Sequence, residues 1–110
     1  SITSGGAENT VVGDEAGTAV TVGLQNTLIG FRAGDALTDA DHNVAVGRQA
    51  LTTDTLGSRS TAIGRSALEA QNFTSATDAY NTAVGFNAGA LITQGTIKSV
   101  LKANCNSSWI

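Results

Sequence analysis

Apolar and polar positions along the chain follow a short motif that recurs five times. The motif is a polar residue, Thr or Val, a small or aliphatic residue, Val or Ile, and Gly. Its copies are Asn9-Thr-Val-Val-Gly13, Asn26-Thr-Leu-Ile-Gly30, Asn43-Val-Ala-Val-Gly47, Ser60-Thr-Ala-Ile-Gly64 and Asn81-Thr-Ala-Val-Gly85. The closing glycines are spaced by 17, 17, 17 and 21 residues. Self-similarity at this period is typical of solenoid proteins, in which short units stack and bury one another.

A second fixed position lies three residues after each glycine. It is alanine in every copy, namely Ala16, Ala33, Ala50, Ala67 and Ala88, and Gly or Leu follows it. A unit of about 17 residues is too short for a helical hairpin, so the pattern predicts one coil with two short strands and two turns. We therefore predict an all-β fold, a parallel β-solenoid of about five 17-residue coils.

Stacking of equivalent positions predicts what fills the interior. Residues alternate between the two faces of a strand, and we expect the last aliphatic residue of each motif to line the interior opposite the alanines. This expected interior column is Val12, Ile29, Val46, Ile63 and Val84. A Leu at Ala50 should overpack the alanine wall, whereas a Leu at Ala40, in a variable stretch, should be nearly silent.

Two further columns follow from the motif. The asparagines are expected to stack as a hydrogen-bonded ladder at a turn. The motif glycines, Gly13, Gly30, Gly47, Gly64 and Gly85, are expected to adopt a conformation that is closed to residues with a Cβ atom.

The opposite face of each strand is apolar as well. It carries the middle residues of the motif, Val11, Leu28, Ala45, Ala62 and Ala83. Strands that are apolar on both faces need cover on both, and a single narrow roll covers only one. The pattern therefore predicts that several parallel copies of the chain pack together.

The repeat divides the chain into two parts. Residues 1–95 are predicted to form the β-roll repeat domain, and residues 96–110, which lack the motif, a cap, a junction or a tail. Because the chain begins at Ser1 without Met or a leader segment, we expect it to be a fragment of a longer fibre chain. It contains no run of 18 apolar residues, so membrane insertion by this segment is not expected.

Composition and charge limit the classes of partner that we expect the chain to bind. Apolar residues make up 41% of the chain but aromatic residues only 5%, so a core of Ala, Val, Leu and Ile is expected to stabilise a monomer weakly. The net charge of −3 disfavours nucleic acid, whose affinity depends on clustered Lys and Arg. The single Cys105 cannot form a disulfide within the chain, and a cross-link between chains is the alternative to an unpaired thiol.

Residues with catalytic or ligand-binding chemistry are sparse. His42 is the only histidine and no nucleophile-elbow pattern precedes a serine, so we expect no catalytic residues and interpret His42 as a polar turn residue. Asp39, Asp41 and Asn43 have calcium-loop spacing, but the required Gly and final Glu are missing, which favours a solvated acidic turn over a metal site. The glycines match no phosphate-binding loop, and no cofactor is expected.

Charged and aromatic residues occupy the two variable positions after the motif glycines. They are Phe31, Arg32, Arg48, Arg65 and Phe86. We interpret them as solvated residues or as support for their neighbours.

The one irregular spacing indicates a candidate binding loop. Four extra residues lie between the last two motif glycines, and the motif then resumes intact, so the excess is expected to bulge outward around residues 71–80. This loop holds Phe73, Asp78 and Tyr80, the candidate receptor-binding residues, since exposed rings on loops are common binding anchors. The alternative is that Phe73 folds back to plug the roll and Tyr80 covers a turn.

The run Asn-Thr-Ala-Val-Gly, followed after two residues by Ala and then Gly or Leu, resembles the head repeats of trimeric autotransporter adhesins of the YadA type. It resembles the repeats of bacteriophage tail fibre proteins more closely, because adhesin repeats are usually shorter and carry Ser-x-Ala-x-Gly. The resemblance covers Asn9 to about Thr93. It implies a left-handed β-roll, an intertwined or side-by-side homotrimer and attachment to a cell surface, but it supplies no binding residue.

These observations predict a non-catalytic, extracellular segment of a trimeric bacteriophage tail fibre, with structural and host-attachment roles. Its expected partners are further copies of the chain and a cell-surface glycan or protein receptor. The head of a bacterial trimeric autotransporter adhesin is the alternative. Two other classes are a carbohydrate-active enzyme and an ice-binding β-solenoid, which needs a regular exposed Thr array. The Thr file of Thr10, Thr27, Thr61 and Thr82 is interrupted by Val44, which we expect to point inward.

Overall fold

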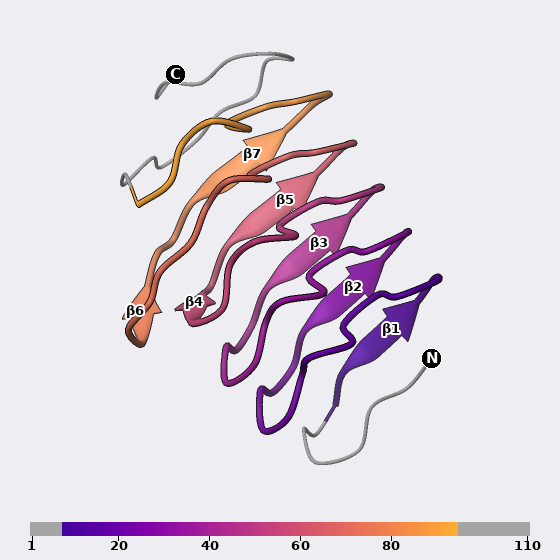
Figure 1. Ribbon diagram of the computed structural model, residues 1–110, viewed down its shortest axis with the longest axis vertical. Coiled ribbons are helices and arrows are strands. Elements are labelled where there is room, and N and C mark those ends of the chain that lie inside the picture. Colours follow the sequence, from indigo (N-terminus) through magenta and orange to yellow (C-terminus); the bar gives the residue numbers. More distant parts are fainter. Residues whose placement is uncertain (1–7, 95–110) are drawn as a thin grey trace.

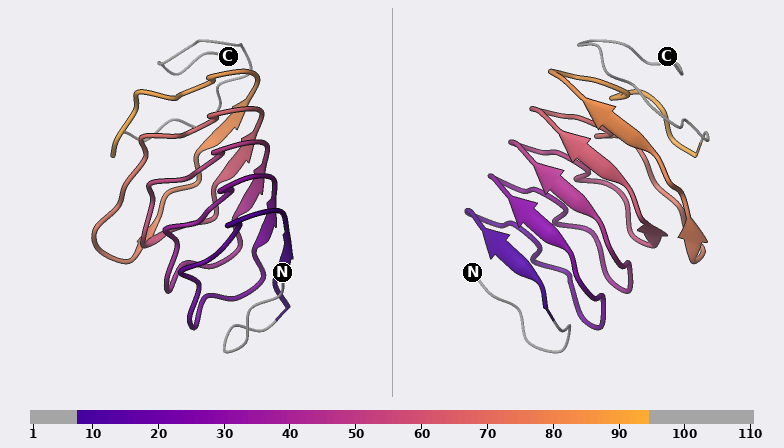
Figure 2. Two further views of the ribbon diagram at one scale, coloured as in Figure 1. Left: turned by 45° about the vertical axis from the view of Figure 1, so that its right-hand side comes forward. Right: turned by 180° about the vertical axis from the view of Figure 1, so that it is seen from behind.

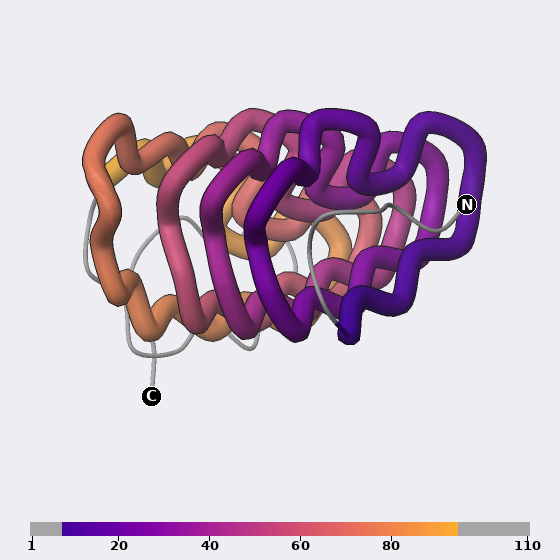
Figure 3. Tube along the Cα trace, turned by 90° about the horizontal axis from the view of Figure 1, so that it is seen from below, coloured from indigo at the N-terminus to yellow at the C-terminus, as the bar shows by residue number. Residues whose placement is uncertain are grey.

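The chain forms a stack of similar coils in a computed structural model that describes residues 8–94. Within this range it contains strands and turns and no helix. The strands are β1 (Thr10–Val12), β2 (Thr27–Ile29), β3 (Val44–Val46), β4 (Gly57–Ser58), β5 (Thr61–Ile63), β6 (Thr77–Asp78) and β7 (Thr82–Val84). Figure 1 shows the coils rising in chain order, and Figure 3 shows that successive coils follow similar flattened outlines.

Five of the strands form one parallel sheet, in the order β1-β2-β3-β5-β7. Equivalent motif positions pair directly, so that Thr10 aligns with Thr27, and Thr27 with Val44. Four complete windings join these strands (Figure 2), which confirms the predicted parallel β-solenoid with its spacing of about 17 residues. A second strand is present in only two coils, where β4 pairs with β6. The predicted segment 96–110 and Cys105 lie outside the described residues.

The face that the sheet turns to the interior is the opposite of the predicted one. The middle motif residues Val11, Leu28, Ala45, Ala62 and Ala83 are buried, at most 2% exposed. The expected interior column of Val12, Ile29, Val46, Ile63 and Val84 lies outside, and Val44 shares that outer face. Alternation fixes which residues share a face, but both faces are apolar here. The narrow interior accepts the smaller set, so the β-branched set is left outside.

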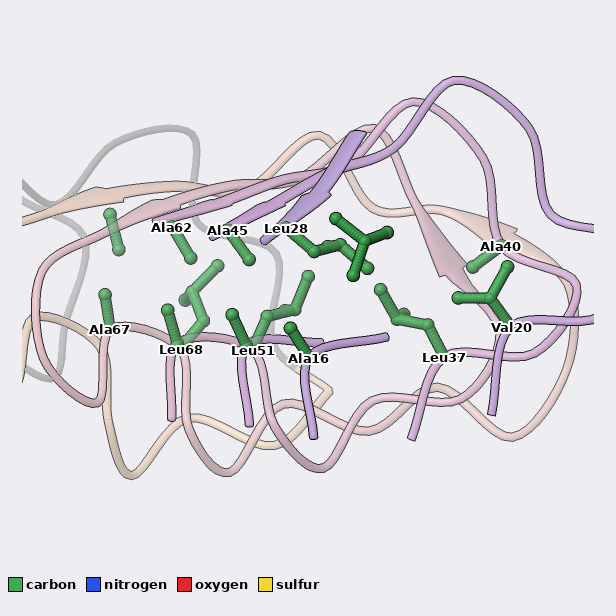
Figure 4. Packing of buried hydrophobic residues seen from close by; sticks show 14 of the residues in the cluster. Ala16, Val20, Leu28, Leu37, Ala40, Ala45, Leu51, Ala62, Ala67 and Leu68 are labelled. Atoms are coloured by element: carbon green, nitrogen blue, oxygen red, sulfur yellow. The ribbon is translucent and has the colours of Figure 1, made fainter. Parts of the chain in front are cut away.

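The repeated alanines form the opposite wall, as predicted. Ala16, Ala33, Ala50, Ala67 and Ala88 are each 0% exposed. In Figure 4, Ala16 and Ala67 lie across the interior from the sheet residues Leu28, Ala45 and Ala62. The expectation for Ala40 is wrong: it is also 0% exposed, beside Val20 at one end of the interior. The variable stretch closes the roll there, so this alanine is a core residue.

In four of the coils, a larger side chain on one wall of the roll faces a smaller residue on the opposite wall. Each sheet residue faces the residue that follows the alanine (Figure 4), and the pairs are Val11 with Gly17, Leu28 with Gly34, Ala45 with Leu51, and Ala62 with Leu68. A Cβ atom on Gly34 would lie 2.7 Å from a methyl carbon of Leu28. A large residue on one wall therefore requires a small one on the other, which keeps the interior close-packed.

The motif glycines allow the coils to approach closely where each strand ends. Their φ angles lie between 126° and 135°, and a Cβ on Gly30 would come within 2.8 Å of the backbone of Gly47. This confirms the predicted conformation.

The asparagine ladder is present and runs from side chain to backbone. Asn9 Oδ1 accepts a hydrogen bond from the N–H of Asn26 at 2.8 Å, and Asn26 Oδ1 accepts one from the N–H of Asn43 at 2.9 Å. The Nδ2 groups of Asn9, Asn26 and Asn43 each donate to a backbone carbonyl, for example Asn43 to Gly57 at 2.9 Å. The ladder satisfies buried backbone groups at the start of each strand.

Candidate functional site

Residues 8–94, the part of the chain that the structure describes, enclose no pocket. They also hold no group of three or more His, Cys, Asp or Glu side chains placed to bind a metal ion. Among the same residues no helix is long and apolar enough to cross a membrane. His42 is exposed in a turn, with φ of 61°, and Asp41 Oδ1 accepts the N–H of Leu24 at 2.8 Å.

The extra residues of the irregular coil form a short bulge. As far as Asn72 the chain keeps the 17-residue offset from the previous coil, whereas Thr77 in β6 is offset by 20 residues. Three of the four extra residues are therefore inserted here, and residues 74–76 are all exposed, whereas the fourth lies between Asp78 and Thr82, where the offset reaches 21 residues. Gln71 and Ala79, near the ends of the predicted loop, are buried instead. The protruding part is therefore shorter than expected.

The three candidate receptor-binding residues are presented differently. Phe73 is half-buried, and its ring lies close enough to Gly57 that an added Cβ there would be 2.9 Å from the ring. Asp78 forms an ion pair with Arg59 at 3.2 Å. Tyr80 is 60% exposed. Phe73 thus packs back onto the roll, and Tyr80 is the residue of the three that offers a ring to solvent.

A buried polar cluster underlies this loop. Asp54 and Gln71 are both 0% exposed, at an interior position that is aliphatic in the two preceding coils. Gln71 Nε2 donates to Asp54 Oδ2 at 2.7 Å and to Ser60 Oγ at 3.0 Å. Gln71 Oε1 accepts from Asn81 Nδ2 at 2.7 Å. Where Ser60 replaces the ladder asparagine, Gln71 therefore supplies the missing amide.

The Asp54 carboxylate holds the backbone that leads into the bulge. Its Oδ1 accepts the N–H of Phe73 at 2.8 Å and that of Gly57 at 3.2 Å. Burial raises the pKa of Asp54, and hydrogen bonds from Gln71 and from backbone N–H groups oppose the rise. The cluster was missed by sequence reasoning, although polar residues seven positions after two motif glycines were the available signal.

The outer sheet face, defined here as the outward residues of β1, β2, β3, β5 and β7, is a second candidate surface. One file is Val12, Ile29, Val46, Ile63 and Val84, and the other is Thr10, Thr27, Val44, Thr61 and Thr82. Val12 is 56% exposed and Ile63 is 39% exposed. Contiguous apolar surface of this kind marks interaction sites in soluble proteins.

Comparisons with known proteins add no relative. No family model, no curated protein and no solved structure matches the chain. The functional proposal therefore depends on the repeat and on the surfaces described above.

Proposed function

We propose that this chain is a structural and host-attachment segment of a trimeric fibre of the kind found in bacteriophage tails. The observation that carries the proposal is the outer sheet face, which is regular, apolar and uncovered by the described residues of a single chain. Parallel copies placed around one axis cover this face coil against coil, because every copy presents the same files at the same spacing. The resemblance of the repeat to phage fibre repeats supports the same assignment.

The energetics of the roll also support association. The interior is built largely from Ala and Gly positions with a few Leu and Val, so burial within one chain is limited. Full burial of a Val or Ile side chain contributes roughly 1.5–3 kcal/mol. Covering the outward Val and Ile file therefore adds stabilisation that one chain lacks.

A matched pair of substitutions tests the association. Ile29→Glu places a charge on the outer sheet face, whereas Leu24→Glu places the same charge at a position of similar exposure, 40% against 36%, outside the strands. Size-exclusion chromatography with light scattering should show a trimer for the wild type and for Leu24→Glu, and a monomer for Ile29→Glu. A folded wild-type monomer, or equal dissociation of both variants, would contradict the proposal.

Attachment is tested with the exposed ring of Tyr80, which follows β6. Fluorescently labelled protein is applied to a panel of bacterial strains, and Tyr80→Ala should lower binding while the trimer and its unfolding temperature stay unchanged. Phe73→Ala is a poorer probe, because that ring packs against Gly57. Unchanged attachment by an assembled Tyr80→Ala fibre excludes Tyr80 as the contact, and no attachment of the wild type to any strain rejects the attachment role.

Two alternatives share the geometry. A bacterial adhesin head would present the same roll, and a membrane anchor rather than a virion-attachment domain in the parent chain would select it. One observation supports ice binding. The Thr file lies on the outward face of the sheet, and Val44 occupies its place in that file instead of pointing inward. Thermal hysteresis by a monomer would favour ice binding, since a trimer of the proposed kind covers this face.

A further inference from the structure

Two arginines between two phenylalanines line the turn that follows the motif glycine. Phe31, Arg48, Arg65 and Phe86 occupy the first position after the glycine in four successive coils. Both arginines are exposed, and Phe86 is 48% exposed. These four residues are called the arginine ridge below.

Hydrogen bonds between coils fix the backbone of the ridge. The N–H groups of Gln49, Ser66 and Asn87 donate to the carbonyls of ridge residues one coil earlier, at 2.8, 2.9 and 2.9 Å. Neighbouring parallel strands are about 4.7–4.9 Å apart, so the ridge residues are held at a regular spacing. A side chain on such a scaffold loses little backbone freedom when it binds a ligand.

Each arginine is stacked on a ring. The guanidinium carbon of Arg48 lies 5.4 Å from the centroid of Phe31, and that of Arg65 lies 5.4 Å from the centroid of Phe86. Both distances are within the range of cation–π attraction. Because Phe31 precedes Arg48 by one coil and Phe86 follows Arg65 by one coil, the two side chains lean apart. The two guanidinium groups therefore lie toward the two ends of the ridge, each beside a phenylalanine ring.

The charge of the two arginines is not compensated by the described part of the chain. Between residues 8 and 94, neither Arg48 nor Arg65 forms an ion pair, whereas the other two arginines each contact a carboxylate at 3.2 or 3.3 Å. Arg48 donates a hydrogen bond to the uncharged Gln49 side chain. Each guanidinium group can therefore pair with an anionic group of a ligand.

From this geometry we propose that the arginine ridge binds an anionic glycan. Two successive carboxylate or phosphate groups of the glycan each bind one guanidinium group, which forms paired hydrogen bonds with such anions, and a sugar ring lies against the exposed part of Phe86. The exposed ridge runs along the stack and suits a polymer better than a small molecule. This inference rests on the proposed attachment role and names the chemical class of the receptor.

A nucleic acid fits the ridge less well. Its affinity comes from neutralising many closely spaced phosphates, whereas the ridge offers two arginines in a chain of net charge −3. A polymer with one charge per sugar unit matches two cations better.

The test measures binding of the full chain to immobilised polymers by biolayer interferometry. The probes are polygalacturonate, its neutral methyl ester, and poly(glycerol phosphate). We expect binding to at least one anionic polymer and none to the ester, with the two anionic probes separating a carboxylate from a phosphate ligand. Arg48→Gln and Arg65→Gln should each weaken binding roughly tenfold, and binding should fall as salt concentration rises.

Control variants keep the test specific. Arg59→Gln removes the same charge at the other end of β5 and should change binding to the polymer less than twofold, by our estimate for a charge outside the ridge. Phe86→Leu keeps an apolar side chain but removes the ring, and it should weaken binding. Unfolding temperatures measured by circular dichroism show whether each variant keeps the fold.

Several results would overturn the inference. They are equal binding of the ester, equal loss in Arg59→Gln, and binding of a single-stranded oligonucleotide as strong as that of either polymer. If the wild type attaches to cells but binds neither anionic polymer, glycan binding by the arginine ridge is rejected and the attachment role is retained. Polymer binding that requires both arginines, without attachment to any strain, rejects the attachment role and keeps the ridge.

Discussion

At the scale of residues, the size of single side chains determines the distance between the two walls of the roll. The interior has one wall of repeated alanines and one wall of sheet residues, and a methyl group is the largest side chain that the alanine positions hold. Gly34 and Leu51 show that the neighbouring position accepts either extreme of size in almost the same backbone conformation, with φ of 56° and 54°. What differs is the residue opposite, Leu28 in one coil and Ala45 in the other.

Ala50→Leu should overpack the interior. Ala50 is 0% exposed, and an added isobutyl group has no space without shifting the walls, which typically costs about 1–3 kcal/mol. Ala76→Leu, in the exposed bulge, is the matched control and should leave the free energy of unfolding unchanged. Urea denaturation measures both, and equal effects would show that the alanine file is not a packing constraint.

A double-mutant cycle tests whether a large side chain on one wall of the roll requires a small residue opposite. Leu28→Ala leaves a cavity and should cost about 2–5 kcal/mol, and Gly34→Leu alone should clash with Leu28, because a Cβ there already approaches within 2.7 Å. The double variant recreates the pair found in the next coil and should be more stable than the two separate losses predict. Strictly additive losses would refute the coupling.

At the scale of strands and loops, the repeat predicts positions better than orientations. The location of β2 and its pairing with β1 follow from the motif, since equal sequences stack most simply in register. The orientation does not follow, because Leu28 and Ile29 are both apolar and alternation alone cannot choose between them. The structure turns Leu28 inward because the interior is narrow: in the next coils Ala45 on the sheet leaves room for Leu51.

The candidate site was harder to predict than the fold. Four extra residues are evident from the spacing, but their division into three at residues 74–76 and one after Asp78 depends on which backbone groups remain paired between coils. The cluster of Asp54 and Gln71 needs three coils to bring its partners together. Spacing along the chain does not reveal such contacts, although polar residues in an aliphatic column mark the place.

The stability of this region should depend on pH through Asp54. Burial raises its pKa in the folded state above the usual value of 3.8, so the folded chain binds this proton more tightly than the unfolded chain does. Its contribution to stability is therefore fully present below about pH 3.8 and is lost as pH rises through the raised pKa. Urea unfolding at a series of pH values should show the free energy of unfolding falling across this window.

Asp54→Asn should flatten that profile. The groups that contact the carboxylate are the Gln71 amide and the backbone N–H groups of Thr55, Gly57 and Phe73, and none of these titrates in the window. Asp39→Asn removes an exposed carboxylate and serves as the control, for which the wild-type fall should persist. Parallel profiles for wild type and Asp54→Asn would rule out Asp54 as the cause.

At the scale of the whole molecule, the proposed trimer makes stability depend on concentration. Folding and association are coupled when the outer sheet face is buried between copies, so the unfolding temperature should rise over roughly a hundredfold increase in protein concentration. Ile29→Glu should unfold at a lower temperature that does not change with concentration. Differential scanning calorimetry distinguishes these cases, and a wild-type unfolding temperature independent of concentration would argue for a self-sufficient single chain.

The parallel stacking of equal coils also makes the repeat a unit of length. Fully extended, 17 residues would span about 56–61 Å, yet one coil advances the stack by only about 4.8 Å. Most of the polypeptide therefore contributes to the cross-section of the stack and not to its length. A wide cross-section makes the stack resist bending. Every coil presents the same edge to the next. Duplication or loss of one repeat in the gene therefore lengthens or shortens the stack by one coil, and the two coils that become neighbours form the same contacts as any other adjacent pair.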